Sequence, residues 1–286
     1  MKVTAPSLAT ATLFVPLMEE PPASSLIVSQ VRVFISSKMY KYGFFSANIK
    51  LPGEYTAGLC VAFYTSNGDV FEKTHDELDF EFLGNTEGKA MEVPNKPFHR
   101  YSILWTAKNI IFYIDDVPIR EVIRNEEMGS EYPSKPMSLY ATIWDASSWA
   151  TSGGKYKVNY KYAPFVSEFK DFALEGCPSD PIEEFPSVDC YESYSRLETA
   201  DYGTITRRQR SAMHKFRQRF MYYSYCYDSL RYPVPPPECV VIPSERDRFR
   251  DTGRLKFGGS HQGRKRRSRR RGRVQVSSTV EYDPDV

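Results

Sequence analysis

The chain has 286 residues, of which 41% are hydrophobic and 26% are charged. This composition supports a buried core and excludes a globally disordered protein. The formal net charge is +2, but residues 264–273 hold eight basic residues and no acid, and without these eight the chain carries −6. A mildly acidic body argues against a nucleic-acid-binding domain, and the absence of eighteen consecutive apolar residues argues against a membrane-spanning helix.

Residues 1–30 lack clear periodicity, whereas short aromatic and β-branched segments bounded by turn residues begin at Val31. Asn67-Gly68-Asp69 and Asp115-Asp116 predict turns, and Pro118 favours an edge strand. Many short strands without long intervening helices predict an all-β, antiparallel sandwich. The predicted strands are 42–50, 56–65, 76–83, 99–105, 110–114, 117–123, 139–144, 158–162 and 167–174.

The composition changes after Cys177, where residues 178–189 are rich in proline and acid and predict a loop. Thr206 and Gln209 have the spacing of a capping box and predict the start of a helix. An apolar stripe at three- and four-residue steps predicts that this helix packs on the sandwich. The stripe consists of Met213, Phe216, Phe220, Tyr223 and Tyr227. The tail from about Gly259 is charged and of low complexity, which predicts disorder.

The chain has five cysteines, and their spacing bears on disulfide bonding and on the cellular compartment. Cys177 and Cys190 are thirteen residues apart, as are Cys226 and Cys239, and this repeated spacing suggests two local disulfides and an oxidising compartment. Cys60 lies in an apolar run and predicts a buried free thiol. Five unpaired cysteines in a reducing cell remain the alternative, and zinc ligation is disfavoured because no CxxC or HxxxH pair occurs.

The most informative segment for chemistry reads HDELDFEFL at residues 75–83. Alternation on a strand places Glu77, Asp79 and Glu81 on one face, with apolar residues on the other. Three neighbouring acids raise at least one pKa, so we expect a retained or shared proton. Two carboxyl groups about 5–5.5 Å apart perform retaining glycoside hydrolysis. An exposed acidic strand or a metal site is the alternative for so short a motif.

Two tryptophans strengthen the interpretation as a sugar-binding site. Trp144 and Trp149 lie close in sequence and precede Gly153-Gly154. Exposed indole faces stack on sugar rings, although a tryptophan at a strand end is more often part of a core.

Taken together, these motifs resemble plant xyloglucan endotransglucosylase/hydrolases of glycoside hydrolase family 16. The similar segments are HDELDFEFLGN (75–85), YGFFSANIKLP (42–52), AGLCVAFYTSNGD (57–69), LYATIWDASSWATSGGKY (139–156) and RFMYYSYCYDSLRYP (219–233). The resemblance runs from about residue 34 to 258, and both cysteine pairs resemble the disulfides of that family's C-terminal extension.

The resemblance implies a β-jelly-roll sandwich with a short α-helical, disulfide-bearing extension. It implies Glu77 as nucleophile, Glu81 as general acid and then base, and Asp79 as helper. It also implies substrate contacts at Glu81, Ser148, Trp149, Gly153 and Arg231, although Ser148 stands where the family often has an acid. The expected division is 1–33 as an atypical N-terminal segment, 34–176 as the sandwich, 177–258 as the extension and 259–286 as a basic tail.

The resemblance further implies cleavage of the β-1,4-glucan backbone of xyloglucan and transfer to another xyloglucan chain or to water. We expect no cofactor or metal, no nucleic-acid or membrane partner, a monomer, and secretion to the cell wall or apoplast. Residues 1–23 make a poor export signal, because Pro16 interrupts a short apolar patch that two acids follow.

Two departures from the family keep an alternative open. Residues 86–97 replace two strands that the family carries after its catalytic strand, and residues 1–33 replace its N-terminal strands and signal peptide. The alternative is therefore a glucan-binding remnant with impaired catalysis. A nucleic-acid partner for residues 264–273 is a weaker alternative.

Overall fold

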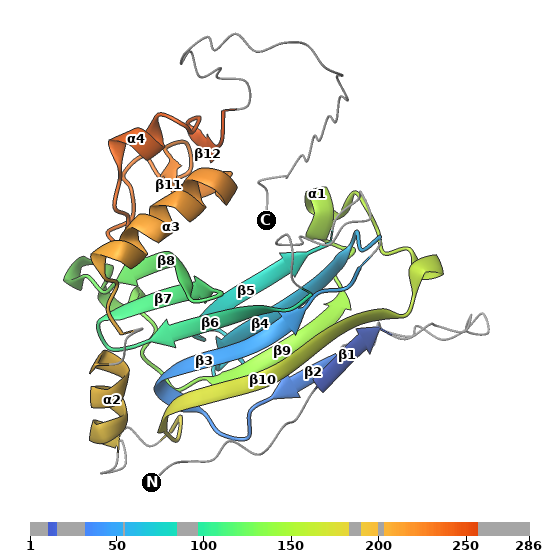
Figure 1. Cartoon of the computed structure of the whole chain (residues 1–286), viewed down its shortest axis with the longest axis horizontal. Coiled ribbons are helices and arrows are strands. Elements are labelled where there is room, and N and C mark those ends of the chain that lie inside the picture. The colour runs from blue at the N-terminus through green and yellow to red at the C-terminus, as the bar shows by residue number, and fades with distance from the viewer. Residues whose placement is uncertain are drawn as a thin grey trace.

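The computed structural model describes residues 11–15, 32–53, 55–84, 97–182, 190–199 and 203–256. Two antiparallel sheets stack face to face, and a smaller unit containing a third sheet lies at one end (Figure 1). The predicted antiparallel β-sandwich is therefore confirmed. No helix in the described ranges is long and apolar enough to cross a membrane. The tail from 257 and the proposed loss of strands at 86–97 fall outside the described residues, apart from Pro97.

Six strands form the larger sheet in the order β1, β10, β3, β6, β7, β8. Their bounds are Ala11–Val15, Phe165–Pro178, Tyr40–Lys50, His99–Trp105, Asn109–Ile114 and Val117–Ile123. Asp115 and Asp116 have positive φ and form the predicted tight turn between β7 and β8. Pro118 lies on the edge strand β8, as its missing N–H donor predicts.

Four strands form the smaller sheet in the order β2, β9, β4, β5. Their bounds are Arg32–Ile35, Ser138–Asp145, Leu59–Ser66 and Glu77–Leu83. Side chains alternate across these strands, so one face of each packs into the core between the sheets. Phe80 on β5 packs there against Tyr101 and Phe112, at ring-centre distances of 5.4 and 5.3 Å.

This packing predicts a large effect of Phe80→Ala. The Phe80 side chain is 8% exposed, and its loss leaves a cavity between the two sheets. We expect the free energy of unfolding to fall by about 3–5 kcal/mol. Denaturant titration measures this, with Ile123→Ala as the control because Ile123 is 52% exposed. Equal losses in both variants would contradict the role of Phe80 in the core.

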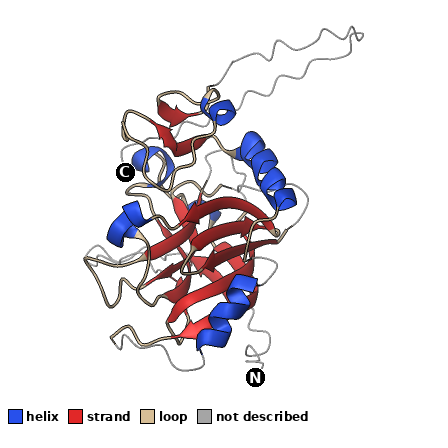
Figure 2. Cartoon of the chain, turned by 90° about the vertical axis from the view of Figure 1, so that its left-hand side faces the viewer, coloured by secondary structure: helices blue, strands red, loops and turns tan. Residues whose placement is uncertain are grey.

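The C-terminal extension lies against one end of the larger sheet and along its edge strand (Figure 2). Helix α2 (Cys190–Thr199) packs Leu197 against the outer face of the sheet, and helix α3 (Arg207–Phe220) lies along the edge strand β8. A helix along an open edge protects it from pairing with another chain. Short helix α4 (Pro243–Arg246) and the ribbon β11 (Tyr223–Asp228) with β12 (Thr252–Arg254) complete the extension.

Both predicted disulfides are present, Cys177–Cys190 and Cys226–Cys239, and Cys60 is a buried free thiol as predicted. The first disulfide joins the end of β10 to α2, and the second ties β11 to the loop that follows it. The extension is thus linked covalently both to the sandwich and within itself.

Three expectations about secondary structure need correction. The predicted helix starts at its Thr206–Gln209 capping box but ends at Phe220, because Met221 takes an extended conformation. Tyr223 and Tyr227 lie instead on β11, where Tyr227 stacks on Phe249 at 5.0 Å. The predicted apolar stripe is therefore wrong beyond Phe220.

The predicted strand at 158–162 is also wrong. The Asn159 side chain accepts a hydrogen bond from the Lys161 N–H and caps a 3₁₀ turn, Tyr160–Tyr162, that replaces the strand. Conversely, β1 arises in a segment whose sequence shows no strand periodicity, by pairing its backbone with β10.

Candidate active site

Strand β5 alternates as the sequence predicts. Its buried residues point into the core, and its acids lie on the opposite, exposed face. The buried side chains are Leu78, Phe80 and Phe82, and the acids are Glu77, Asp79 and Glu81. The core thereby fixes the orientation of the strand, and a single strand carries all three acids.

Neighbouring strands provide the floor beside these acids. Tyr64 on β4 lies opposite Asp79, and Ala62 lies opposite Glu81. On the next strand, β9, Tyr140 pairs with Tyr64, and their rings stack at 4.9 Å. The Tyr140 hydroxyl donates to Asp69 at 2.7 Å. An aromatic pair therefore lies in the same cross-strand row as Asp79.

Tyr64 and Tyr140 are site residues that the sequence does not predict. The sequence shows which side chains alternate along β4 and along β9. It does not show the register of β4 against β5 or of β9 against β4. The predicted turn at Asn67-Gly68-Asp69 is the one feature of the sequence that suggests the strands on either side of it pair and bring Tyr64 near Asp79.

The pKa of Asp79 lies well above the ordinary value for an aspartate. Desolvation, the charges of Glu77 and Glu81 and a hydrogen bond with Glu77 raise the pKa of Asp79 to about 8. Asp79 is therefore protonated in neutral or acidic solution and donates to Glu77. This agrees with the expectation that three close acids retain a proton.

Glu81 is perturbed in the same direction. Desolvation and the charge of Glu77 raise its pKa above the ordinary value. Beyond the other end of the acid row, His75 Nε2 lies 3.7 Å from Glu77 Oε2. Glu77 thus has a hydrogen-bond donor on one side and an imidazole on the other, and Glu81 keeps its proton to a higher pH than an ordinary glutamate.

These raised pKa values predict a pH-dependent stability. A carboxyl group with a raised pKa in the folded state binds more protons there than in the unfolded chain. The free energy of unfolding therefore falls as pH rises from about 4, the ordinary aspartate pKa, toward the folded pKa of Asp79, about 8. We expect Asp79→Asn to flatten this dependence in thermal unfolding scans.

The exposed residue Asp251 provides the control for this experiment, since Asp251→Asn makes the same chemical change away from the acid row. An Asp79→Asn variant whose melting temperature follows pH as steeply as the Asp251→Asn variant would show that Asp79 ionises normally.

The tryptophan pair lies beyond the Glu81 end of the row. Trp144 on β9 lies opposite Cys60 on β4, and Cys60 lies opposite Leu83, two cross-strand rows past Glu81. Trp149 lies 5.8 Å from Trp144, and both are partly buried against small residues of β4. Ser148 is exposed just before Trp149. Gly153 is exposed in the short helix α1 (Ala150–Gly154).

Cys60 lies beneath this end of the site and is fully buried. Desolvation and the charges of Glu81 and Asp79 raise its pKa to about 12. The thiol is therefore neutral and unreactive in the folded protein.

Arg231 occupies a different part of the molecule from the other predicted substrate contacts. It follows β11 in the extension, where its N–H donates to Asp228 at 3.0 Å and its guanidinium lies 5.7 Å from the Tyr232 ring centre. In Figure 1, α1 and the β11–β12 ribbon lie toward opposite ends of the upper side. The contacts of the described residues do not bring Arg231 to the acid row.

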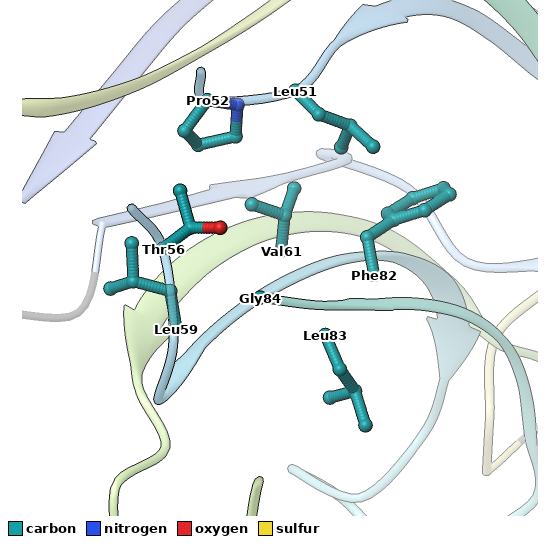
Figure 3. Close-up of a pocket in the computed structure, with 8 residues that line it drawn as sticks. All are labelled: Leu51, Pro52, Thr56, Leu59, Val61, Phe82, Leu83 and Gly84. Atoms are coloured by element: carbon teal, nitrogen blue, oxygen red, sulfur yellow. The ribbon is translucent and has the colours of Figure 1, made fainter. Parts of the chain in front are cut away.

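A small pocket lies on the core side of β5, away from the acids (Figure 3). The side chains of Leu51 and Phe82 are neighbours in its lining. Its lining has no charged side chain and is formed by Leu51, Pro52, Thr56, Leu59, Val61, Phe82, Leu83 and Gly84. It is a small apolar gap between the sheets and does not contain the acids.

The described part of the chain contains no group of three or more His, Cys, Asp or Glu side chains arranged to hold a metal ion. The three acids on β5 are therefore not assembled as a metal site.

Comparison with known proteins agrees with this geometry. Residues 24–93 and 89–162 match Glycosyl hydrolases family 16, and residues 193–239 match the Xyloglucan endo-transglycosylase (XET) C-terminus. An Arabidopsis thaliana relative, "Probable xyloglucan endotransglucosylase/hydrolase protein 30", is 61% identical over 275 residues, which cover 88% of this chain and 80% of the relative. The chain belongs to the xyloglucan endotransglucosylase/hydrolase family. A second Arabidopsis member of this xyloglucan endotransglucosylase/hydrolase family, "Probable xyloglucan endotransglucosylase/hydrolase protein 29", is 56% identical, with 86% of this chain and 80% of the relative covered.

The comparisons also bear on the two segments, 86–97 and 1–33, in which the sequence departs from the family pattern. The family 16 match is in two pieces that meet at residues 89–93, where the sequence predicts the missing strands. Nevertheless, four fifths of each of these two relatives is covered, and the acid row is assembled on β5. The alternative of a glucan-binding remnant is not favoured.

Proposed function

We propose that this protein cleaves the β-1,4-glucan backbone of xyloglucan with retention and transfers the glycosyl group to another xyloglucan chain or to water. The observation that carries the proposal is the row of three acids on β5, in which Asp79 is protonated beside Glu77 and Glu81 has a raised pKa. The names of the two Arabidopsis relatives supply the substrate class.

In the first step, a Glu77 carboxylate oxygen attacks the anomeric carbon. The protonated Asp79 carboxyl group donates a hydrogen bond to Glu77 and orients it. Glu81 gives its proton to the leaving glycosidic oxygen as the carbon–oxygen bond breaks. A covalent glycosyl–Glu77 intermediate and a free glucan end result.

In the second step, the ionised Glu81 takes a proton from a hydroxyl of the acceptor chain or from water. The acceptor oxygen attacks the same carbon and displaces Glu77, which restores the original configuration. Trp144 and Trp149 lie past the Glu81 end of the row, and we assign them, with Ser148 and Gly153, to the acceptor side. Tyr64 and Tyr140 form the floor at the bond that is cut.

We further propose that residues 34–176 form the catalytic sandwich, that residues 177–258 form the extension, and that the monomeric protein is secreted and acts in the cell wall or apoplast. The two disulfides support an oxidising compartment. Arg231 remains a proposed substrate contact through its position in the family pattern.

The test of the proposal is a transfer assay with unlabelled xyloglucan as donor and a labelled xyloglucan oligosaccharide as acceptor. We expect label to enter polymeric xyloglucan, and reducing ends to accumulate only as far as water competes. A folded protein that transfers no label and releases no reducing ends would contradict the proposed function.

A further inference from the structure

Charge is distributed unevenly along the chain. Residues 1–202 have 18 basic and 28 acidic residues, a net charge of −10, whereas residues 203–256 have 12 basic and five acidic residues, a net charge of +7. The part of the extension from residue 203 onward is thus basic, whereas the sandwich and the first part of the extension, which contains α2, are acidic. Residues 264–273 add eight more basic residues after it. Neither the acid row nor the proposed acceptor side explains this separation.

Helix α3 concentrates the positive charge of the extension. It holds no acid, and its exposed side carries Arg207, Arg208, Lys215 and Arg219. At 100° per residue these four fall within an arc of about 120°, and they span about 18 Å of the helix. Met213, on the opposite side, is buried. The cations therefore form a basic stripe (Arg207, Arg208, Lys215 and Arg219) that faces away from the packed side.

The basic stripe has no anionic partner among the described residues. The described ion pairs of α3 are made by His214 and Arg217 with Glu245, and by Arg210 with Glu121. These residues anchor the helix to α4 and β8 and lie outside the stripe. The four stripe cations are thus available to an external anion.

The stripe also opposes helix stability. Arg207 and Arg208 occupy the first turn, where the helix dipole disfavours cations and where α3 has no acid. Lys215 and Arg219 are four residues apart, a spacing at which like charges repel. A bound polyanion relieves both effects.

We propose that the basic stripe of α3 is a docking surface for a linear polycarboxylate, namely a polysaccharide with about one uronic acid carboxylate per sugar. Four cations over about 18 Å give roughly one charge per 6 Å. Double-stranded DNA has one charge per about 1.7 Å, a far denser pattern. A bilayer surface requires an exposed apolar helix face, whereas the Met213 face of α3 is packed in the protein. The choice of a wall polysaccharide rests on the proposed function.

Docking at α3 leaves the catalytic face free for neutral xyloglucan. The acidic sandwich repels a polyanion, so that a long polycarboxylate is attracted to the extension and disfavoured at the acid row. The surface therefore tethers the enzyme to an acidic polymer while it acts on a neutral one.

The experiment measures binding of the full chain to immobilised polygalacturonate at low and physiological ionic strength, with neutral dextran as the blank. The test variant changes Arg207, Arg208, Lys215 and Arg219 to Gln. The matched control removes the same charge from exposed sites elsewhere, by changing Lys38, Lys73, Lys161 and Arg196 to Gln. A third variant changes the eight basic residues of 264–273 to Gln in the otherwise intact chain.

We expect the wild-type protein to bind polygalacturonate and to lose affinity with salt. We expect the α3 variant to bind about tenfold or more weakly, and the control to stay within about twofold of wild type, since each exposed cation contributes modestly. Transfer activity toward xyloglucan should be unchanged in both, which shows that they fold.

Several results would overturn the proposal: no binding by wild type, equal losses in the α3 variant and its matched control, or binding that survives in the α3 variant and disappears in the 264–273 variant. Tighter binding of DNA or anionic phospholipid vesicles than of polygalacturonate would overturn the assignment to a polycarboxylate. Failure of transfer with binding intact would refute the proposed function and leave the docking surface standing.

Discussion

Replacing Glu77 with Gln is expected to lower glycosyl transfer and hydrolysis by on the order of 10⁴-fold. The amide has the size of the carboxylate but lacks the negative charge that attacks the anomeric carbon. It also loses its role as the anionic acceptor of the Asp79 proton. Because Leu78, Phe80 and Phe82 hold β5 in the core, the fold should survive. The label-transfer assay, together with a thermal unfolding scan, measures both effects.

Chemical rescue separates a nucleophile from a merely structural residue. Glu77→Ala leaves space for azide, which attacks the anomeric carbon directly and yields a glycosyl azide of inverted configuration. Glu72→Gln is the matched control, because Glu72 is exposed in the loop before β5 and lies on the far side of His75 in sequence. Azide rescue with retained configuration in Glu77→Ala, or equal activity losses in both Gln variants, would contradict the assignment of Glu77 as nucleophile.

The local part of the site could be predicted from the sequence, because strand alternation is a property of one segment. Residues 75–83 alone place three acids on one face and their apolar neighbours on the other. What surrounds Asp79 depends on the registers of β4 against β5 and of β9 against β4. A shift of one residue would have replaced Tyr64 by a core residue, and no single segment specifies that choice.

The end of α3 is also set by residues far along the chain, which local sequence patterns do not reveal. Periodicity continues from Met213 through Tyr227, so the sequence predicts one long helix. The helix ends instead at Phe220, and the chain becomes extended from Met221. In β11, Tyr227 is buried by stacking on Phe249, and Cys226 bonds to Cys239. These partners lie more than ten residues further along the chain, and a helical pattern contains no information about them. The cysteine spacing predicts the disulfide correctly, but it does not show that the disulfide ends the helix.

Replacing Glu81 is the second change with a large expected effect, and its signature differs from that of Glu77. Glu81→Ala removes the proton donor for the leaving oxygen, so transfer from xyloglucan should fall by about 10²–10⁴-fold. A xyloglucan oligosaccharide with an aryl leaving group of low pKa departs without protonation. Its release should therefore be far less impaired than cleavage of the natural glucan. The pKa of Glu81, raised by desolvation and by the charge of Glu77, equips this residue to hold the proton.

The second step tests the same residue as a base. Without Glu81, the glycosyl–Glu77 intermediate accumulates on the aryl substrate, because no group deprotonates the incoming hydroxyl or water. Azide needs no deprotonation and should rescue turnover, giving a glycosyl azide of retained configuration, opposite to that from Glu77→Ala. Mass spectrometry of the trapped enzyme and the configuration of the azide together assign the roles. An aryl substrate slowed as much as xyloglucan, with no trapped intermediate, would contradict Glu81 as the acid and base. The two azide products must have opposite configurations, since one arises by a single displacement and the other by two.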